Sequence, residues 1–427
     1  MRWIHVELAP ALAYPLRMGR ARTRKPEPPR RSRRRLLAAG AAAAVVVAAL
    51  IVAGIVLAGG SDEQPKSTAA APTKDLAGCS TTEVGEARLD CYTAAFDDAV
   101  LGAKDPLAAV AAISQEAYAE SGPLLVNCHG LMHAVGRKLA AERGITLATL
   151  MDYLPKSNDP GCSAGFAHGL VTAVAPQIDT SKPKEAASVC GEAKTRYERY
   201  SCVHGFGHAF MRIYSDRLEP ALALCRKLGQ QAPDCAQGAF HDYWFSIGGF
   251  DDAAKQADPV TDPAVLCGRQ AEEFVRPCWY RAFVDNRPDT PVTRATDLDR
   301  LCLGLAGLQR DACITAASVV GPADPRAQMA LCYGYRGDEA LACVRGVKAQ
   351  NFLGRGSDLY VDLIKRCDAF GEDRVRLGCY RWLGKAIAVL TNGAFERSGC
   401  LALQSDDAID ACVAGAKSMN EALVTFS

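Results

Sequence analysis

The chain is poor in histidine and lacks the short motifs that mark several common kinds of site. Only 7 of its 427 residues are histidine. The sequence contains no Walker phosphate loop, no G-x-G-x-x-G loop after a predicted strand and no C-x-x-C-H haem-attachment sequence. These absences exclude the usual signatures of nucleotide binding and of covalently attached haem.

Excess positive charge is confined to the first 35 residues. Those residues hold eleven lysines and arginines against two glutamates, whereas the whole chain has a net charge of only +1. The remainder therefore carries a net charge of −8. An acidic remainder has no general affinity for nucleic acid, so no nucleic-acid partner is predicted.

One long apolar run follows these basic residues. Residues 36–57 read LLAAGAAAAVVVAALIVAGIVL and contain no charged side chain. At about 1.5 Å per residue this run is about 33 Å long as a helix, enough to cross a bilayer core. The preceding arginines predict that the N-terminus stays in the cytoplasm.

The N-terminal region is therefore predicted to tether the protein to the cell membrane in a single pass. We expect a basic cytoplasmic tail at 1–35, a transmembrane signal anchor at 36–58 and a flexible stalk at 59–77, with the bulk of the chain extracytoplasmic. A cleaved export signal is the alternative, because SRRRLL at 32–37 resembles a twin-arginine signal.

All 18 cysteines lie after the apolar run, and most fall into regularly spaced pairs. An even number of cysteines in an oxidising compartment predicts disulfides and not thiolate metal sites. Eight pairs are separated by ten to twelve positions: Cys79/Cys91, Cys190/Cys202, Cys225/Cys235, Cys267/Cys278, Cys302/Cys313, Cys332/Cys343, Cys367/Cys379 and Cys400/Cys412. We predict that each pair is a structural disulfide.

The sequence around each pair has the pattern of a helical hairpin. In 218–229, LEPALALCRKLG predicts an amphipathic helix that ends near its cysteine; a short polar loop follows, and CAQGAFHDYWF opens a second helix. The pattern recurs about every 35 residues, a period typical of α-solenoids. The predicted fold is therefore all-α: a right-handed solenoid, or superhelix, of disulfide-stapled hairpins that follows one transmembrane helix.

Cys128 and Cys162 lack a partner at the usual spacing. Each stands where the second cysteine of a pair is expected, and no cysteine precedes either one by ten to twelve residues. We predict that they bond to each other and join the starts of two neighbouring helices.

Four short windows contain six of the seven histidines. They are CHGLMH at 128–133, CSAGFAH at 162–168, CVHGFGH at 202–208 and CAQGAFH at 235–241. The cysteine pattern continues to the end of the chain, but the place of the last histidine is later taken by Val284, Val319, Ala349, Lys385 and Ser418. This confinement favours a local function for residues 78–250 and a scaffold role for 251–427.

The spacing of the histidines is suited to binding a metal ion. His129/His133 and His204/His208 are four residues apart, which places each pair on one face of a helix. Neighbouring hairpins would add two single histidines. The predicted metal ligands are His129, His133, His168, His204, His208 and His241. Imidazole-only sites suit zinc, copper or iron, with non-covalent haem as a second reading. The competing interpretation is a set of core histidines satisfied by hydrogen bonds.

Four carboxylates and four glycines are weaker candidates for the site. Asp97, Glu116 and Glu120 are predicted additional ligands, and Asp242 ranks below them because it points about 100° away from its neighbour His241. The glycines of the windows, Gly130, Gly165, Gly205 and Gly238, predict either close helix packing or room for a ligand.

Two functions of different classes follow. The first is a metal- or haem-binding envelope protein, with redox or hydrolytic chemistry that the sequence leaves unspecified. The second is a non-catalytic solenoid scaffold whose surface binds another cell-envelope protein or a polymer. Confinement of the histidines favours the first, and the lack of a complete catalytic motif favours the second.

Overall fold

The computed structural model describes residues 76–81, 86–120, 123–157, 159, 161–248, 260–286, 291–347, 357–391 and 399–418. Within these ranges all regular structure is helical. Residues 69–427 cluster into one unit. The predicted tail, the predicted anchor and residues 59–75 of the predicted stalk lie outside the described residues. No described helix is both long and apolar enough to cross a membrane.

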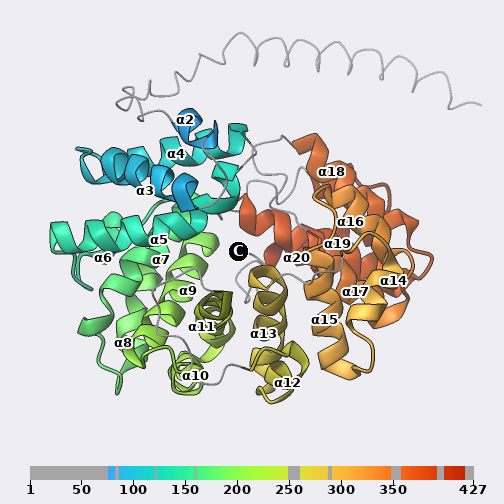
Figure 1. The fold of residues 1–427 in the computed structure, drawn as a ribbon. Coiled ribbons are helices and arrows are strands. Elements are labelled where there is room, and N and C mark those ends of the chain that lie inside the picture. The colour runs from blue at the N-terminus through green and yellow to red at the C-terminus, as the bar shows by residue number, and fades with distance from the viewer. Residues whose placement is uncertain are drawn as a thin grey trace, which may run out of the picture. The chain divides into compact units, whose positions relative to one another are not determined.

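Ten helices carry either the second cysteine of a pair or one of the two cysteines without a close partner, and we call them the inner helices (Figure 1). Their bounds are α3 (Glu86–Leu101), α5 (Pro123–Arg143), α7 (Cys162–Ala173), α9 (Arg196–Ile213), α11 (Ala232–Gly248), α13 (Glu272–Asp285), α15 (Gly307–Val319), α17 (Gly337–Arg345), α19 (Asp373–Leu390) and α20 (Asp406–Lys417).

Shorter helices connect the inner ones. They are α2 (Leu76–Thr81), α4 (Pro106–Glu120), α6 (Leu150–Tyr153), η1 (Ala175–Gln177), α8 (Pro183–Ala187), η2 (Ser188–Glu192), α10 (Leu218–Arg226), η3 (Gly229–Gln231), α12 (Pro263–Gly268), α14 (Ala295–Leu301), α16 (Pro325–Cys332), α18 (Ser357–Lys365), η5 (Arg366–Ala369) and η6 (Cys400–Ala402). In Figure 1, α8, α10, α12 and α14 lie at the periphery.

The inner helices pack side by side in chain order. Each contacts the next, from α3 and α5 through to α19 and α20, and α9 also touches α19. Burial is greatest in α7, where every residue from Cys162 to Thr172 is buried. An element enclosed on all sides must be apolar or have its polar groups satisfied, so the polar residues of this layer need an explanation.

Nine disulfides join the helices, and all 18 cysteines are used. The eight predicted close pairs are confirmed. Cys128 and Cys162 are also bonded to each other, with their Cα atoms 5.0 Å apart, which confirms that prediction. In the chain-entropy model each closed loop of about a dozen residues contributes about 3 kcal/mol, so the disulfides compensate for the shortness of the hairpins.

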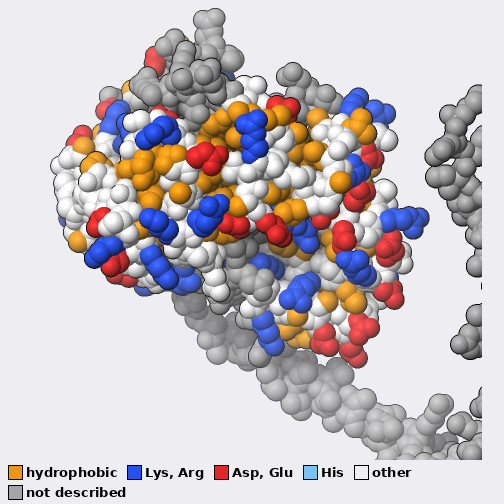
Figure 2. All heavy atoms as spheres, turned by 90° about the horizontal axis from the view of Figure 1, so that it is seen from below, with side chains coloured by type: hydrophobic (Ala, Val, Ile, Leu, Met, Phe, Trp, Pro, Cys, Tyr) orange, Lys and Arg blue, Asp and Glu red, His pale blue; other side chains and the backbone are white. Residues whose placement is uncertain are grey.

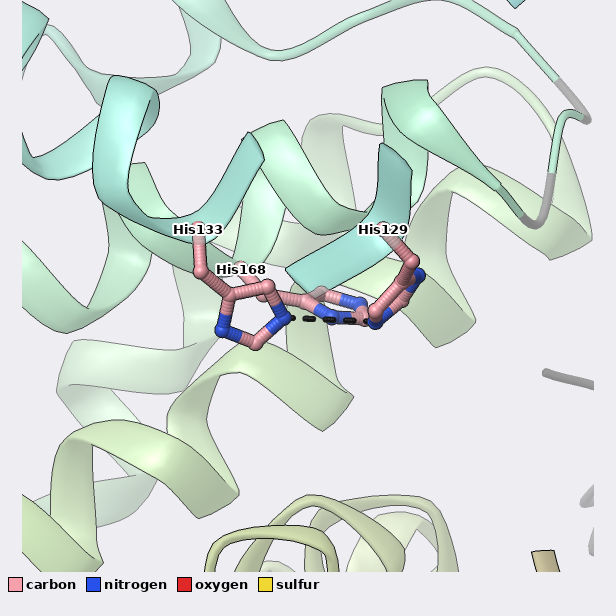
Figure 3. Close-up of side chains that lie close together, drawn as sticks. All are labelled: His129, His133 and His168. Atoms are coloured by element: carbon pink, nitrogen blue, oxygen red, sulfur yellow. Dashed lines mark hydrogen bonds between the residues drawn. The ribbon is translucent and has the colours of Figure 1, made fainter. Parts of the chain in front are cut away.

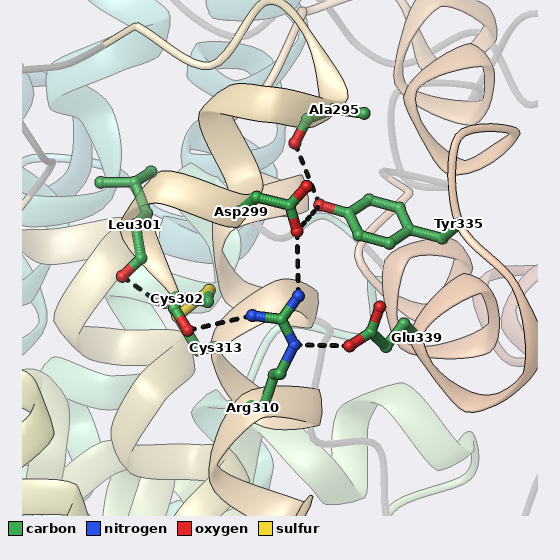
Figure 4. Close-up of polar contacts among 8 residues, drawn as sticks. All are labelled: Ala295, Asp299, Leu301, Cys302, Arg310, Cys313, Tyr335 and Glu339. Carbon is green, nitrogen blue, oxygen red and sulfur yellow. Dashed lines mark hydrogen bonds and ion pairs between the residues drawn. A yellow bond between two sulfur atoms is a disulfide. The ribbon is translucent and has the colours of Figure 1, made fainter. Parts of the chain in front are cut away.

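Polar contacts tie the later hairpins together (Figure 4). Arg310 on α15 donates to Asp299 on α14 at 2.9 Å and also to Glu339 on α17. Tyr335 donates to the carbonyl of Ala295 at 3.0 Å. These bonds connect successive units at their partly exposed edges. Figure 2 shows acidic and basic side chains interspersed with apolar ones on one face of the molecule.

Candidate metal centre

The four histidine windows lie on four consecutive inner helices, α5, α7, α9 and α11. Local sequence determines where these helices begin. At α9 the Thr195 side chain accepts from the backbone of Glu198, whose own side chain caps Thr195 in return. At α7 the Asp159 carboxylate accepts the backbone N–H groups of Gly161 and Ser163, both at 2.8 Å. These caps fix where α7 and α9 begin, with the window at the first residue of α7 and six residues into α9.

Two of the window glycines allow very close helix packing. A Cβ atom on Gly165 would lie 2.1 Å from the carbonyl oxygen of His129, and one on Gly238 would lie 2.0 Å from that of His204. No larger residue fits at either place without moving a helix. Gly165 therefore brings α7 against α5, and Gly238 brings α11 against α9. Gly130 differs, because its nearest neighbour would be the Phe245 ring at 3.6 Å.

This packing brings all six window histidines into one cluster. Ring centroids of neighbouring imidazoles are 4.4 to 5.9 Å apart, from the His168–His204 pair to the His204–His241 pair. The later windows are linked to the earlier ones through His133 and His208, at 4.9 Å. The convergence on which the sequence argument depended is therefore present in the structure.

His129 and His133 point their Nε2 atoms at each other across 3.2 Å (Figure 3). The Nδ1 atom of His129 lies 3.1 Å from the carbonyl oxygen of Gly161, which can only accept. Neutral His129 therefore carries its proton on Nδ1 and presents a lone pair at Nε2. Two nitrogens that bind one tetrahedral ion at about 2.0–2.1 Å lie about 3.3 Å apart. The observed spacing fits two ligands of one metal ion.

His168, His204 and His208 form a fully buried group behind this pair. Among the described residues, His204 has no hydrogen-bond partner at either ring nitrogen, and His168 has none at Nδ1. The other nitrogen of His168 lies 3.2 Å from the hydroxyl of Ser201. The Nδ1 atom of His208 lies 2.6 Å from the Asp242 carboxylate. A carboxylate in this position orients an imidazole so that its Nε2 atom can bind a metal.

His241 completes the cluster beside a buried ion pair. Its Nδ1 atom has no hydrogen-bond partner, and its Nε2 atom is 4.0 Å from Asp285 on α13. Asp285 is paired at 3.0 Å with Arg281, which is itself buried. The opposite charges of this pair offset each other, so the ion pair adds little net charge next to the imidazoles.

Three of the imidazoles are shifted towards the uncharged form. Desolvation, followed by the charges of neighbouring histidines, lowers the pKa values of His133, His168 and His204 well below the ordinary value for histidine. Desolvation raises the pKa of Asp285 to about 6, against the opposing effect of Arg281. A neutral imidazole is the form that binds a metal ion. His133, His168 and His204 are therefore in the form that binds a metal ion at neutral pH.

Two groups of three histidines have the geometry of metal ligands. The ligand nitrogens of His129, His133 and His168 lie within 4.8 Å of one another, as do those of His168, His204 and His208. His241 is the remaining ring, 5.5 Å from His129 and 5.0 Å from His208 between centroids.

The predicted carboxylates have different environments. Asp97 forms an ion pair with Lys138. Glu116 is half-buried on α4, outside both groups of ligand nitrogens. The side chain of Glu120 lies outside the described residues. Asp242, which the sequence ranked lowest, contacts His208 directly. The ranking considered only its angle to His241 on the same helix and overlooked the neighbouring helix α9.

Sequence reasoning missed three contributors. Val284 occupies the position in the α13 hairpin that corresponds to the last histidine of a window, and Asp285 is the next residue. A search that extended one residue beyond the histidine position would have included Asp285. Ser201 and the Gly161 carbonyl have no sequence signal. A fourth feature is the string GCSAG at 161–165, which has the letters of a G-x-S-x-G nucleophile elbow. A nucleophile elbow lies between a strand and a helix. Ser163 is near the start of α7, the described residues before it form no strand, and its hydroxyl lies 3.2 Å from that of Ser114.

No protein-family model, curated protein or solved structure matches the chain. The function must therefore be inferred from the site itself.

Proposed function

We propose that this protein binds transition-metal ions through its six clustered histidines. The observation that supports it best is His204, which is fully buried and has no hydrogen-bond partner at either ring nitrogen in the part of the chain that the structure describes. A buried polar group without a partner costs about 1–3 kcal/mol. A metal ion bound at one of these nitrogens would remove part of that cost. The unpartnered Nδ1 atoms of His168 and His241 support the same reading.

The competing interpretation, a set of core histidines satisfied by hydrogen bonds, accounts for only part of the cluster. It suits His129, which is bonded to the Gly161 carbonyl, and His208, which is bonded to Asp242. It does not suit His204. Nor does it explain why six imidazoles gather where apolar side chains would pack without a polar cost.

Metal ions fit the cluster better than haem. A bis-histidine haem needs a slot as wide as the macrocycle between its two axial rings. Here His168 and His204 are nearly parallel with centroids 4.4 Å apart, and His208 lies 5.2 Å from His168. This packing leaves space for single ions. Because every cysteine is in a disulfide, the ligands are imidazoles, which suit zinc, copper or iron.

We also propose that the protein is anchored in a membrane and that its metal site lies on an extracytoplasmic solenoid. Nine disulfides favour an oxidising compartment, and the apolar run at 36–57 favours a single-pass membrane anchor with an extracytoplasmic bulk. The contacts of each inner helix with the next in chain order support an α-solenoid as the frame that carries the site. Its right-handed turn is part of the proposal.

The test is elemental analysis of the full-length protein, solubilised in detergent and exposed to zinc, copper or iron. The test variant carries H129A, H133A, H204A and H208A. The control is His5→Ala, which removes the one histidine outside the windows. We expect the native protein and the control to retain stoichiometric metal and the fourfold variant to lose it. Circular dichroism and mapping of the nine disulfides would confirm that the variant folds.

Equal, substoichiometric metal in all three proteins would refute the proposal. The scaffold hypothesis would then remain, with another envelope protein or a polymer as the partner.

A further inference from the structure

The two groups of three histidines differ in their access to solvent. His129 and His133 on α5 are partly exposed, whereas His168, His204 and His208 are buried. An ion held by buried side chains is shielded from ligands in solution, whereas an ion held by partly exposed side chains can bind one. The difference in burial therefore separates two chemical roles within one cluster.

His168 belongs to both groups, but one nitrogen atom binds only one ion. Its Nε2 atom already faces Ser201, and its Nδ1 atom is unpartnered. His168 lies closest to His204, with their rings nearly parallel. We therefore assign His168 to the buried group. The remaining ring, His241, has its centroid 5.5 Å from His129 and 5.7 Å from His133. It belongs to neither group whose ligand nitrogens lie within 4.8 Å of one another.

We propose that the cluster holds two metal ions with different roles. An inner ion is enclosed by His168, His204 and His208. An outer ion is held by His129 and His133, next to His241, and keeps coordination positions open to a small anionic ligand. This inference rests on the proposed function, since it divides the same six histidines.

The surroundings of the outer ion leave room for that ligand. Gly130 is exposed, and a side chain there would contact only the Phe245 ring, at 3.6 Å. Phe245 in turn lies against His241, with 5.3 Å between ring centroids. The absence of a side chain at Gly130 thus keeps the edge of the cluster open. Gly165 and Gly238 have a different role, because they are buried in helix contacts.

The first experiment counts the ions and measures their release. Native mass spectrometry of the zinc-loaded full chain should show two ions. A chelator should remove them in two phases whose rates differ at least tenfold. The outer variant, H129A with H133A, should keep one ion, released only in the slow phase. The inner variant, H204A with H208A, should lose the slow phase.

The second experiment uses azide as the small anion. Azide added to the copper-loaded native protein should produce a ligand-to-copper charge-transfer band. The outer variant should lose this band while it keeps its remaining ion. Gly130→Val should keep both ions and weaken azide binding at least tenfold, because its side chain fills the opening. Ala141→Val, at an exposed position three turns further along the same helix, is the matched control and should leave azide binding unchanged.

The results separate the two levels of inference. One ion per native chain, or a single release phase, would overturn the two-ion arrangement and leave metal binding intact. An azide band that persists in the outer variant would place the open position on the inner ion and would also overturn the assignment. No bound metal under any condition would refute the proposed function itself.

Discussion

The pair α9–α11 and the pair α19–α20 are built in the same way, yet only the first carries histidines. A Cβ atom on Gly207 or Gly238 would lie 2.0 Å from a carbonyl oxygen of the partner helix. Gly384 and Gly415, at the same distances from their cysteines, would make the matching contacts at 2.4 and 1.9 Å. The glycines therefore belong to the frame.

The side chains at three equivalent positions are what distinguishes the pairs. His204, His208 and His241 in the first pair correspond to Arg381, Lys385 and Ser418 in the second, counted from the cysteine of each helix. A cationic arginine or lysine does not bind a metal ion, so the second pair has the geometry without the ligands. Close helix packing is thus separable from the chemistry that it supports. Four predictions test this separation.

The largest expected effect is a loss of stability of the metal-free protein in acid. His133, His168 and His204 have lowered pKa values when folded, so below about pH 6.5 the unfolded chain binds more protons. Below that pH, each histidine that stays neutral in the folded protein lowers the free energy of unfolding by about 1.4 kcal/mol per pH unit. Asp285 has a folded pKa of about 6, so below that pH its protonation stabilises the folded protein. This single group offsets only part of the loss from the three histidines.

Urea unfolding of the metal-free protein at pH 7.5, 6.5 and 5.5 measures this loss. H204Q should reduce the pH dependence of the free energy of unfolding by about one third, because it removes one of three similar titrating groups. A midpoint that does not change with pH would contradict the assignment of neutral histidines.

Metal removal should have the next largest effect, confined to the histidine-bearing helices. Metal at about 100 times its dissociation constant stabilises the folded state by about 2.7 kcal/mol. Amide protons that exchange only when the site opens and releases its metal should therefore exchange about a hundredfold more slowly. Hydrogen exchange with and without a chelator should therefore change in α5, α7, α9 and α11. It should remain the same in α19 and α20. Equal changes in both regions would argue against a local site.

Substituting the frame glycines should have a smaller effect, of similar size in both pairs. Gly238→Ala and Gly415→Ala each force two helices apart, and such overpacking costs about 1–3 kcal/mol. Both variants should melt at lower temperature than the native protein. Only Gly238→Ala should also weaken metal binding, because it moves α11, which carries Asp242, away from His208 on α9. A metal-binding defect in Gly415→Ala would show that the two regions are coupled.

The smallest expected effect concerns the carboxylate that orients His208. Asp242→Asn keeps the size of the side chain but removes the negative charge that the imidazole N–H contacts at 2.6 Å. Loss of such a partner lowers metal affinity by about 10- to 100-fold. Competition with a zinc indicator would measure the change, and Asp97→Asn, remote from both ligand groups, should have none. An unchanged affinity in Asp242→Asn would remove Asp242 from the site.

The sequence predicted much of this arrangement because its strongest signals are local. Two cysteines ten to twelve residues apart, such as Cys225 and Cys235, are close in any hairpin that the loop between them allows. Two histidines four residues apart share a helix face. Cys128 and Cys162 could be paired by elimination. The carboxylate partners could not be predicted, since Asp242 and Asp285 act on histidines from neighbouring helices.

The amino-acid sequence by itself determined the helical hairpins, the disulfide pairs and the confinement of histidine to four windows. These depend on separations of a few residues, within which covalent geometry leaves few arrangements. Only the tertiary structure decided that the six imidazoles meet, which of them are sealed from water and which carboxylates support them. Those outcomes depend on how far each helix slides and turns against the next, and here backbone contacts at Gly165 and Gly238 set that distance.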